Sequence, residues 1–400
     1  MKNNPALIGR KADELLPRLV AFLRDIIAIP SPSGQEQAVL ERIELELRKA
    51  GFDRVEYDPV GNLYGVIGAG SKKILYNGHV DTVGVSTAGN WLWDPFTGKH
   101  ENSIVYGRGA ADMKGAVASF VYGGRLIREL ELTGDYTLAM AFVVQEEDCE
   151  GSAIGLAHKN GWIPGSREWD FVLLGEPSNL RIVRGQRGKV EMKAVTRGIS
   201  AHGSMPWAGD NAIYRMAPLI RGIELLNPDL PSDPFLGKGS VAATRIECRT
   251  ASNNSIPDEC TLCIDRRLTM GETGPGARDQ ISGLSGESGA EVEILTYDQM
   301  SYRGFRVQNI KDFPAWVLPE GHVLVRKADE TFRELFEHES VIGRWDFSTD
   351  GVYTCGVAGL PTIGFGPGEE RHCHTVEEQV SEEHLRAAMM FYAALPAKLS

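Results

Sequence analysis

The chain has 400 residues, of which 42% are hydrophobic and 24% are charged, and its formal net charge is −12. This composition is typical of a globular protein that buries a substantial core, and the length predicts two domains. The acidic balance and the lack of a basic cluster argue against nucleic acid as a partner.

The N-terminal segment and the cysteines bear on cellular location. In residues 1–34, apolar residues recur at helical spacing between charges, which indicates a surface helix and not a signal peptide. No apolar run is long enough to span a bilayer, so no membrane partner is expected. Six scattered cysteines fit a reducing compartment better than a disulfide framework, and we expect a cytoplasmic protein.

The first part of the chain alternates helices with strands. Helices are predicted near residues 10–29 and 34–50, and short strands around Val55 and Tyr64. The runs KKILYNG, YTLAMAFVV and FVLLG are interpreted as buried strands, with a helix from residue 112 to about 132 between the first two. This order predicts an α/β fold, with a mainly parallel sheet and helices on both faces.

The pattern changes near Arg184. Residues 185–309 are interpreted as strand, helix, two strands, helix and strand, which is the β-α-β-β-α-β order of a ferredoxin-like fold. The α/β pattern resumes with a helix near residues 328–338, and a last helix should end at Pro396. We therefore expect residues 1–184 and 310–400 to form the α/β domain, with residues 185–309 inserted as an α+β domain.

Histidine and acidic residues follow several of these predicted strands. The carboxyl ends of parallel strands meet at one edge of a sheet, and imidazoles and carboxylates are ligands of zinc. Taken singly, each residue has another interpretation, such as a surface histidine, a helix N-cap or a solvated loop. Their convergence favours a metal site. The residues are His79, Asp81, Asp112, Glu146, Glu147, Glu176 and His374.

Two of the spacings suggest a division of roles. His79 and Asp81 are two residues apart, so in an extended segment the carboxylate of Asp81 can accept a hydrogen bond from the second ring nitrogen of His79. Glu146 and Glu147 are adjacent, so one can coordinate a metal ion while the other faces the substrate. A base that serves as a metal ligand could not transfer a proton.

Seven motifs resemble the zinc metallopeptidase and deacylase family that includes glutamate carboxypeptidase G, acetylornithine deacetylase, succinyl-diaminopimelate desuccinylase and the aminoacylases. They are GHVDTV, YGRGAADMKGA, VQEEDCEG, LLGEPS, ISAHGSMPWAGDNAI, the stretch from NSIPDE to DRRL, and HTVEE. They span nearly the whole chain in the family's order and spacing. Further strings, among them RGQRGKVEM and DFSTDGV, resemble the branch called selenium metabolism-linked hydrolases.

The resemblance implies a ligand set for two zinc ions, for which cobalt or manganese could substitute. Asp112 would bridge the two ions. His79 and Glu176 would complete one site, and Glu147 and His374 would complete the other.

The same resemblance implies catalytic roles. Glu146 would be the general base, and Asp81 would orient His79. His202 would reach the active site of a partner subunit and stabilise the oxyanion, because the inserted domain corresponds to the family's lid and dimerisation domain. The implied substrate contacts are Asn254, Arg344 and Gly366.

The implied activity is hydrolysis of an amide bond in a small N-acyl amino acid or peptide-like substrate by a homodimer. A dipeptidase or carboxypeptidase would use the same metal site. A Rossmann-type nucleotide site in GRGAADMKG is weakly supported, because the third glycine is missing and Asp112 stands where phosphate would bind. A non-catalytic relative is disfavoured because every ligand is present, and a serine hydrolase because no G-x-S-x-G occurs.

Overall fold

The computed structural model describes residues 4–85, 91–132 and 134–400, and within them nine strands form a central sheet. Its order is β1-β2-β6-β3-β7-β20-β8-β18, with β19 paired to β8. The strands are β1 (Arg54–Tyr57), β2 (Leu63–Ile67), β3 (Lys72–His79), β6 (Tyr136–Val143), β7 (Phe171–Leu174), β8 (Ile182–Gln186), β18 (Trp316–Val317), β19 (Ile342–Trp345) and β20 (Thr362–Gly364).

Three parallel pairs lie at the centre of this sheet, where β6, β3, β7 and β20 are neighbours, and β19 also pairs in parallel with β8. The pairs β1–β2, β2–β6, β20–β8 and β8–β18 are antiparallel. All residues of β6 are buried, as expected for a parallel strand that is covered on both faces. The prediction of a mainly parallel sheet is confirmed, with antiparallel strands towards its edges.

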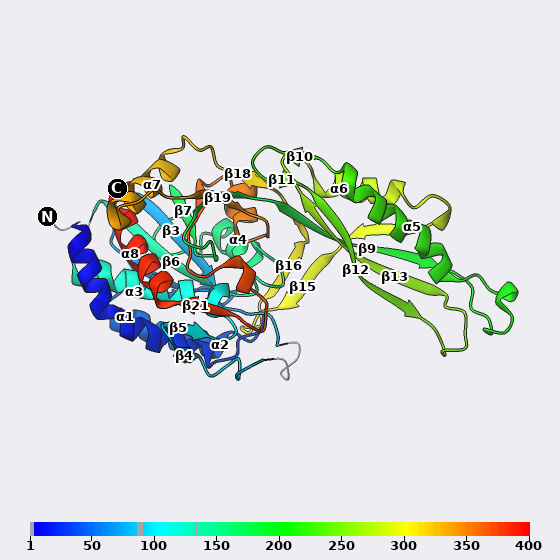
Figure 1. Ribbon diagram of the computed structural model, residues 1–400, viewed down its shortest axis with the longest axis horizontal. Coiled ribbons are helices and arrows are strands. Elements are labelled where there is room, and N and C mark those ends of the chain that lie inside the picture. The colour runs from blue at the N-terminus through cyan, green and yellow to red at the C-terminus, as the bar shows by residue number, and fades with distance from the viewer. Residues whose placement is uncertain (1–3, 86–90, 133) are drawn as a thin grey trace.

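Helices pack around this sheet (Figure 1). They are α1 (Pro5–Ile27), α2 (Gln37–Ala50), α3 (Gly115–Glu129), α4 (Ser152–Lys159), α7 (Val323–Phe336) and α8 (Glu382–Leu399). The side chain of Asn4 caps α1 by accepting a hydrogen bond from the main-chain N–H of Ala6. No helix in the described ranges is both long and apolar enough to cross a membrane.

The prediction that Pro396 ends the last helix is wrong, because α8 continues to Leu399. A proline inside a helix leaves the carbonyl four residues earlier without its usual N–H donor. Here that carbonyl belongs to Tyr392, and it accepts a hydrogen bond of 3.1 Å from the hydroxyl of Tyr76 in β3. The contact with the sheet thus replaces the missing helical hydrogen bond.

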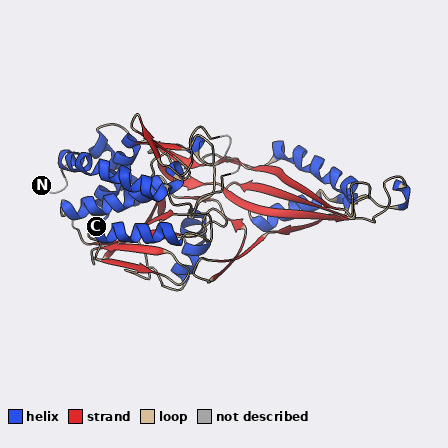
Figure 2. Cartoon of the chain, turned by 90° about the horizontal axis from the view of Figure 1, so that it is seen from below, coloured by secondary structure: helices blue, strands red, loops and turns tan. Residues whose placement is uncertain are grey.

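A second sheet projects from the larger part of the elongated molecule (Figure 1; Figure 2). Its order β12-β13-β9-β14, with α5 and α6 between the strands in the chain, is the predicted ferredoxin-like arrangement. Burial alternates along β13, so one face of this sheet packs on the helices. The elements are β9 (Gly188–Arg197), α5 (Ala212–Leu226), β12 (Ser240–Arg249), β13 (Glu259–Leu268), α6 (Gly274–Gly283) and β14 (Glu291–Ile294).

Shorter strands complete the fold. The strands β21, β5 and β4 form a small sheet beside the central one, and β17 pairs with β9. Their bounds are β4 (Lys99–Glu101), β5 (Ile104–Tyr106), β10 (Ser232–Asp233), β11 (Gly237–Lys238), β15 (Thr296–Met300), β16 (Arg306–Ile310), β17 (Asp312–Phe313) and β21 (Gln379–Ser381).

The two parts have separate hydrophobic cores. The smaller core joins β9, β12 and β13 to α5 and α6. The hairpin β15–β16 belongs to the larger core, because Tyr297 and Val307 pack there. The domain limits of 1–184, 185–309 and 310–400 stay a prediction.

Candidate metal centre

A cavity of about 250 Å³ lies where the central sheet faces the second part of the molecule, which is the part built on the sheet β12-β13-β9-β14 and the helices α5 and α6. All five predicted metal ligands and Glu146 line it. The lining residues are His79, Asp112, Glu146, Glu147, Glu150, Glu176, Lys189, Arg267, Phe347, Ser348, Glu370, Cys373 and His374.

The parallel strands place the buried part of this cluster. His79 is the last residue of β3, and Glu146 and Glu176 follow the ends of β6 and β7. Because β6, β3 and β7 are adjacent and parallel, their carboxyl ends lie side by side. Asp112 precedes α3 and His374 lies in the loop after β20, so tertiary packing brings both to the same edge.

The two imidazoles lie on either side of Asp112. Nε2 of His79 is 3.0 Å from Oδ1 of Asp112, and Nε2 of His374 is 3.2 Å from Oδ2. His374 Nε2 is also 3.1 Å from Oε2 of Glu147. Each oxygen of Asp112 therefore faces a different histidine, which is the arrangement required of a carboxylate that bridges two ions.

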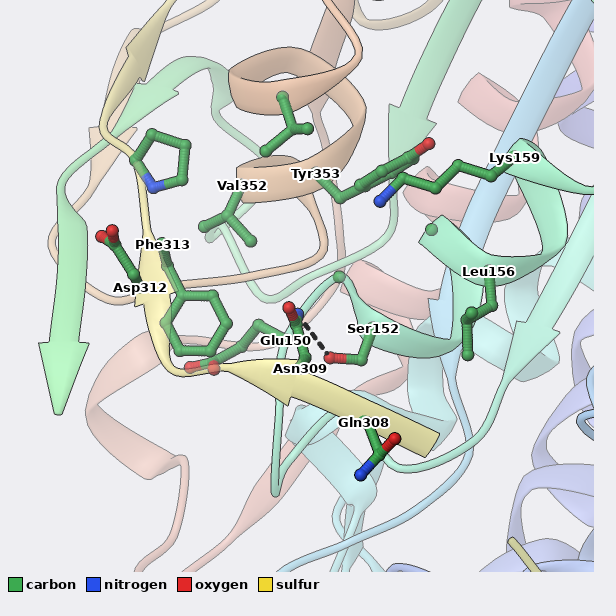
Figure 3. A pocket seen from close by; sticks show the side chains of 14 residues that line it. Glu150, Ser152, Leu156, Lys159, Gln308, Asn309, Asp312, Phe313, Val352 and Tyr353 are labelled. Atoms are coloured by element: carbon green, nitrogen blue, oxygen red, sulfur yellow. Dashed lines mark hydrogen bonds between the residues drawn. The ribbon is translucent and has the colours of Figure 1, made fainter. Parts of the chain in front are cut away.

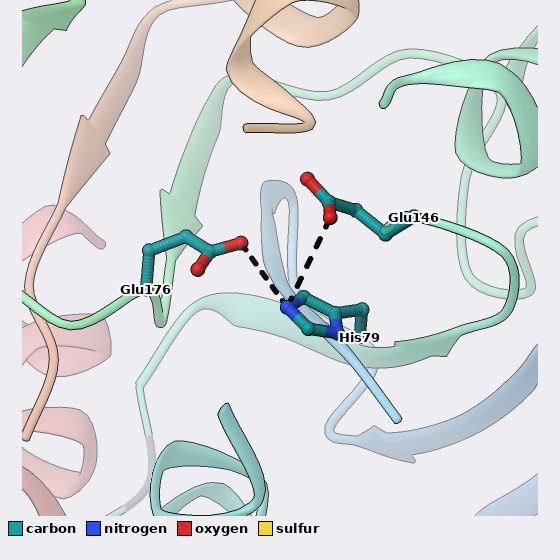
Figure 4. A group of neighbouring side chains, drawn as sticks. All are labelled: His79, Glu146 and Glu176. Carbon is teal, nitrogen blue, oxygen red and sulfur yellow. Dashed lines mark ion pairs between the residues drawn. The ribbon is translucent and has the colours of Figure 1, made fainter. Parts of the chain in front are cut away.

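Two further carboxylates approach His79 from the neighbouring strands, as Figure 4 shows. Oε1 of Glu176 is 3.7 Å from Nε2 of His79, and Oε2 of Glu146 is 3.9 Å from it. All three side chains are buried. By geometry alone, Glu146 could therefore share a metal ion with His79 and Glu176, besides acting as a base.

Electrostatics at the site reflect crowded negative charge. Burial raises the pKa values of Glu146 and Glu176 well above the usual carboxyl range, and it also raises the pKa of Glu147. Burial alone would lower the pKa of His79, but Glu176 and Asp112 outweigh it and raise that pKa well above its usual value. The protons held here compensate charge that a cation would otherwise balance.

The histidine nearer the surface shows the same effect. Hydrogen bonds to Asp112 and Glu147 raise the pKa of His374 to about 10. Burial would raise the pKa of Asp112, but hydrogen bonds from His374 and His79 lower it below the usual range. These shifts favour an ionised Asp112 beside two histidines, a charge arrangement that cations held between these side chains would also satisfy.

The donor set fits divalent metal ions. Two groups, His79 with Glu146 and Glu176 and His79 with Asp112 and Glu147, have ligand atoms within 4.8 Å of one another. Oε1 of Glu146 is buried and has no hydrogen-bond partner among the residues that the structure describes. Nitrogen and oxygen donors of this kind suit zinc and also cobalt or manganese.

Asp81 lies behind the cluster but not as the spacing predicted. Nδ1 of His79 is 2.9 Å from the main-chain carbonyl oxygen of Asp81, and the nearest carboxylate oxygen is 3.6 Å away. The carboxylate instead accepts hydrogen bonds from the main-chain N–H groups of Glu146 and Glu147, at 3.2 and 3.1 Å. The carboxylate is engaged by these N–H groups and by the hydroxyl of Ser33, so the main-chain carbonyl of Asp81 accepts from Nδ1 of His79 in its place.

Two residues predicted from the resemblance lie away from the cavity. His202 and Asn254 are exposed and do not line it. They belong to adjoining loops, since His202 forms a bridge with Ser255 and the main-chain N–H of Gly203 donates to the carbonyl of Asn254 at 2.6 Å. The segment around residue 200, coloured green, lies at the far end of the second part (Figure 1).

The other two predicted substrate contacts have structural partners. Arg344 donates to the main-chain carbonyl of Phe235, which joins β19 to the second part, and it does not line the cavity. Gly366 passes beside Glu176, because an added Cβ would lie 2.2 Å from the carbonyl oxygens of Gly175 and Glu176. Only glycine permits this close approach of two backbones.

Sequence reasoning missed an ion pair between the two parts. Lys189 of β9 pairs with Glu150, and both residues line the metal cavity. Glu150 also lines a second cavity of about 150 Å³ between α4, β16 and residues 352–357, where Asn309 donates to Ser152 at 3.0 Å (Figure 3). The string RGQRGKVEM contains Lys189, but nothing in its local pattern indicates so distant a partner.

Comparisons with known proteins agree with this geometry. The family model for peptidase family M20/M25/M40 matches residues 75–398. The uncharacterized protein YgeY of Escherichia coli (strain K12) is 40% identical over 399 residues, which cover 99% of this chain and 98% of that protein. A succinyl-diaminopimelate desuccinylase of Dinoroseobacter shibae is 28% identical over 296 residues, covering 71% of this chain and 77% of the relative.

Solved structures show the same fold. The dipeptidase Dug1p of Saccharomyces cerevisiae aligns with a TM-score of 0.75 at 14% identity, over 100% of this chain and 99% of that chain. YXEP of Bacillus subtilis, described as a dinuclear metal-binding peptidase from the M20 family, aligns with a TM-score of 0.68 at 16% identity, over 96% and 98%. With a family model that covers most of its length, the chain belongs to peptidase family M20/M25/M40.

Proposed function

We propose that this family member, a metal-dependent hydrolase of amide bonds, removes the acyl group from a small N-acyl amino acid or a similar peptide-like molecule. The observation that carries the proposal is the carboxylate of Asp112 between two imidazoles, at 3.0 and 3.2 Å, in a cavity of about 250 Å³. A cavity of this volume suits a small substrate. The name of the desuccinylase relative supports an acyl group as the part removed.

Five residues would hold the two metal ions. His79, Asp112 and Glu176 would bind one ion, and Asp112, Glu147 and His374 the other. The contacts of Asp112 with both histidines support this assignment, and the nitrogen and oxygen donors favour zinc. When bound, such ions lower the pKa of a water molecule and polarise the carbonyl of the substrate.

Glu146 is suited to move the proton. It is buried beside His79, and one of its carboxylate oxygens has no partner in the described part of the chain. Because burial raises its pKa, it can take a proton from the attacking water and return it to the leaving amine. Glu147, which contacts His374, remains free to act as a ligand.

His202 would act in a homodimer that forms through the second part of the molecule. In a single chain it does not line the cavity, so a second copy would supply it. Strand β12 lies at an edge of its sheet and is exposed from Ala242 to Arg249. Trp207 and Tyr214 of the same part of the molecule are 80% and 75% exposed, so large apolar side chains are also available for pairing.

We also propose a cytoplasmic location. All six cysteines are free thiols in the described chain, although Sγ of Cys248 and Sγ of Cys260 are 3.3 Å apart. Free thiols at such a distance are favoured by a reducing compartment.

Metal analysis and a substrate panel test the function together. We expect the purified protein to contain two zinc ions per chain and to hydrolyse N-acetyl or N-succinyl amino acids. Removal of metal with a chelator should abolish activity, and zinc, cobalt or manganese should restore it. Cleavage of dipeptides in preference to every N-acyl amino acid would overturn the acyl specificity, and full activity without metal would overturn the metal role.

A further inference from the structure

A buried carboxylate without an assigned role lies behind Asp112. Glu378 is 0% exposed, and its Oε1 accepts hydrogen bonds from the main-chain N–H groups of Gly109, Ala111 and Asp112 at 2.9, 3.1 and 3.1 Å. Its Oε2 accepts a hydrogen bond from the guanidinium of Arg108. All of these donors lie in the segment that ends at Asp112.

The conformation of this segment explains why it needs an outside acceptor. Asp112 has φ −123° and ψ 96°, which is outside the helical region, and Gly109 has φ +86°. The N–H groups before α3 therefore point to one place instead of along a helix. The N–H group of Ala110 donates to the carbonyl of Gly107, and those of Gly109, Ala111 and Asp112 converge on one place. Main-chain N–H groups that converge in this way form an anion-binding concavity, and buried N–H groups are costly without an acceptor. The carboxylate of Glu378 fills the concavity.

Glu378 also connects two ligand-bearing segments. It lies four residues after His374, and its main-chain carbonyl accepts a hydrogen bond of 3.0 Å from the N–H of Gly107. Strand β21, which starts at the next residue, pairs with β5 immediately before this loop. The segment that carries His374 and the segment that carries Asp112 are therefore joined through Glu378. Across this junction, Nε2 of His374 is 3.2 Å from Oδ2 of Asp112.

We propose that Glu378 is a positioning residue, which holds the backbone of residues 108–112 so that the carboxylate of Asp112 faces both His79 and His374. This role rests on the proposed function, because it concerns the residue assigned as the bridging ligand. Glu378 itself contacts the main chain and Arg108, and it does not line the metal cavity. It would act on metal binding only through Asp112.

Cobalt binding to the metal-free protein tests the proposal. Glu378→Gln keeps the size of the side chain but replaces one acceptor with an NH₂ donor, which would face either the N–H groups or Arg108. We expect the folded variant to bind Co²⁺ about 10- to 100-fold more weakly at one or both sites, with an altered visible absorption spectrum. Glu377→Gln changes the exposed neighbour and should bind two Co²⁺ as the unmodified protein does.

The outcomes separate this role from the proposed function. If the unmodified protein fails to bind two Co²⁺, the dinuclear centre itself is refuted. If it binds two, and Glu378→Gln binds both with unchanged affinity and spectrum, the positioning role is overturned. If Glu378→Gln does not fold, Glu378→Asp is used to test the role, because aspartate keeps the negative charge on a shorter side chain. Weakened binding of Co²⁺ by Glu378→Asp supports the positioning role, and unchanged binding overturns it. If neither variant folds, Glu378 is a requirement of folding and the positioning role is also overturned.

Discussion

The metal cavity and the far end of the second part carry predicted catalytic residues in opposite settings. At the cavity, His79 and Glu176 are buried, and their neighbours come from several separate elements of the chain. At the far end, His202 is exposed, and its ring Nδ1 accepts a hydrogen bond from the main-chain N–H of Ser204, two residues away.

This difference in burial indicates whether a catalytic residue can function within one copy of the chain or needs a second copy. A cluster of buried carboxylates is stable only when the surrounding chain supplies compensating partners, so the cavity is organised within one copy. The exposed ring of His202, which contacts only Ser204 among the described side chains, has no such organisation. It gains a role only when another surface covers it, for which we propose a second copy of the chain.

The strongest test of the buried region is Glu146→Gln. We expect kcat to fall about 100- to 10,000-fold because the base is lost, while the variant keeps two metal ions per chain. Steady-state kinetics and metal analysis measure the two effects. Asp148→Asn, which changes an exposed carboxylate in the same loop, is the control and should keep both properties. Loss of one metal ion from Glu146→Gln would instead make Glu146 a ligand beside His79.

The corresponding test of the exposed region is His202→Ala. We expect kcat to fall about 100- to 1,000-fold, with metal content unchanged, because a donor to the oxyanion is lost. Mixing this variant with Glu146→Gln under conditions of subunit exchange should restore about a quarter of the activity, since half of the dimers are mixed and each has one intact site. Absence of any recovery in proven mixed dimers would place the action of His202 within its own chain.

A smaller effect is expected from Asp81→Asn. The amide group would present a donor to the N–H of Glu146 or Glu147, so the loop should shift and kcat/KM should fall about 10- to 100-fold. Ser33→Ala removes only the hydroxyl that donates to Asp81 at 2.7 Å, and should cost about 1 kcal/mol of stability. Kinetics and thermal unfolding distinguish the two variants; an Asp81→Asn enzyme with unchanged kcat/KM would show that this backbone support is dispensable.

The last test concerns the pH dependence of metal binding, whose change is about tenfold for each pH unit. In the metal-free protein the pKa of His374 is raised to about 10, so the imidazole stabilises the metal-free fold below pH ~6.5 and loses that contribution as pH rises towards 10. A metal ion must displace this proton from His374. The affinity for metal should therefore rise about tenfold with each unit of increasing pH for every proton released. Calorimetric titration in buffers of different ionisation enthalpy counts the protons. Affinity that is constant between pH 6 and 8 would contradict the raised pKa.

Local pattern was sufficient for much of the fold and for the choice of candidate ligands. Strand ends that carry His79, Glu146 and Glu176 could be recognised because parallel neighbours bring their carboxyl ends together. Local pattern failed where the partner is distant. The helix at Pro396 continues because Tyr76 reaches the free carbonyl of Tyr392, and no nearby residue signals this contact.

The sequence by itself determined the types of element, the order of strands and helices, and which histidines and acids follow buried strands, because these depend on periodicity and on neighbours in the chain. The tertiary structure alone decided that Asp81 supports the backbone of Glu146 and Glu147, and that Glu378 holds the loop before Asp112. Those contacts join residues 65 to 269 positions apart. Such contacts depend on how whole helices and strands pack together, and the local sequence around either residue does not predict that packing.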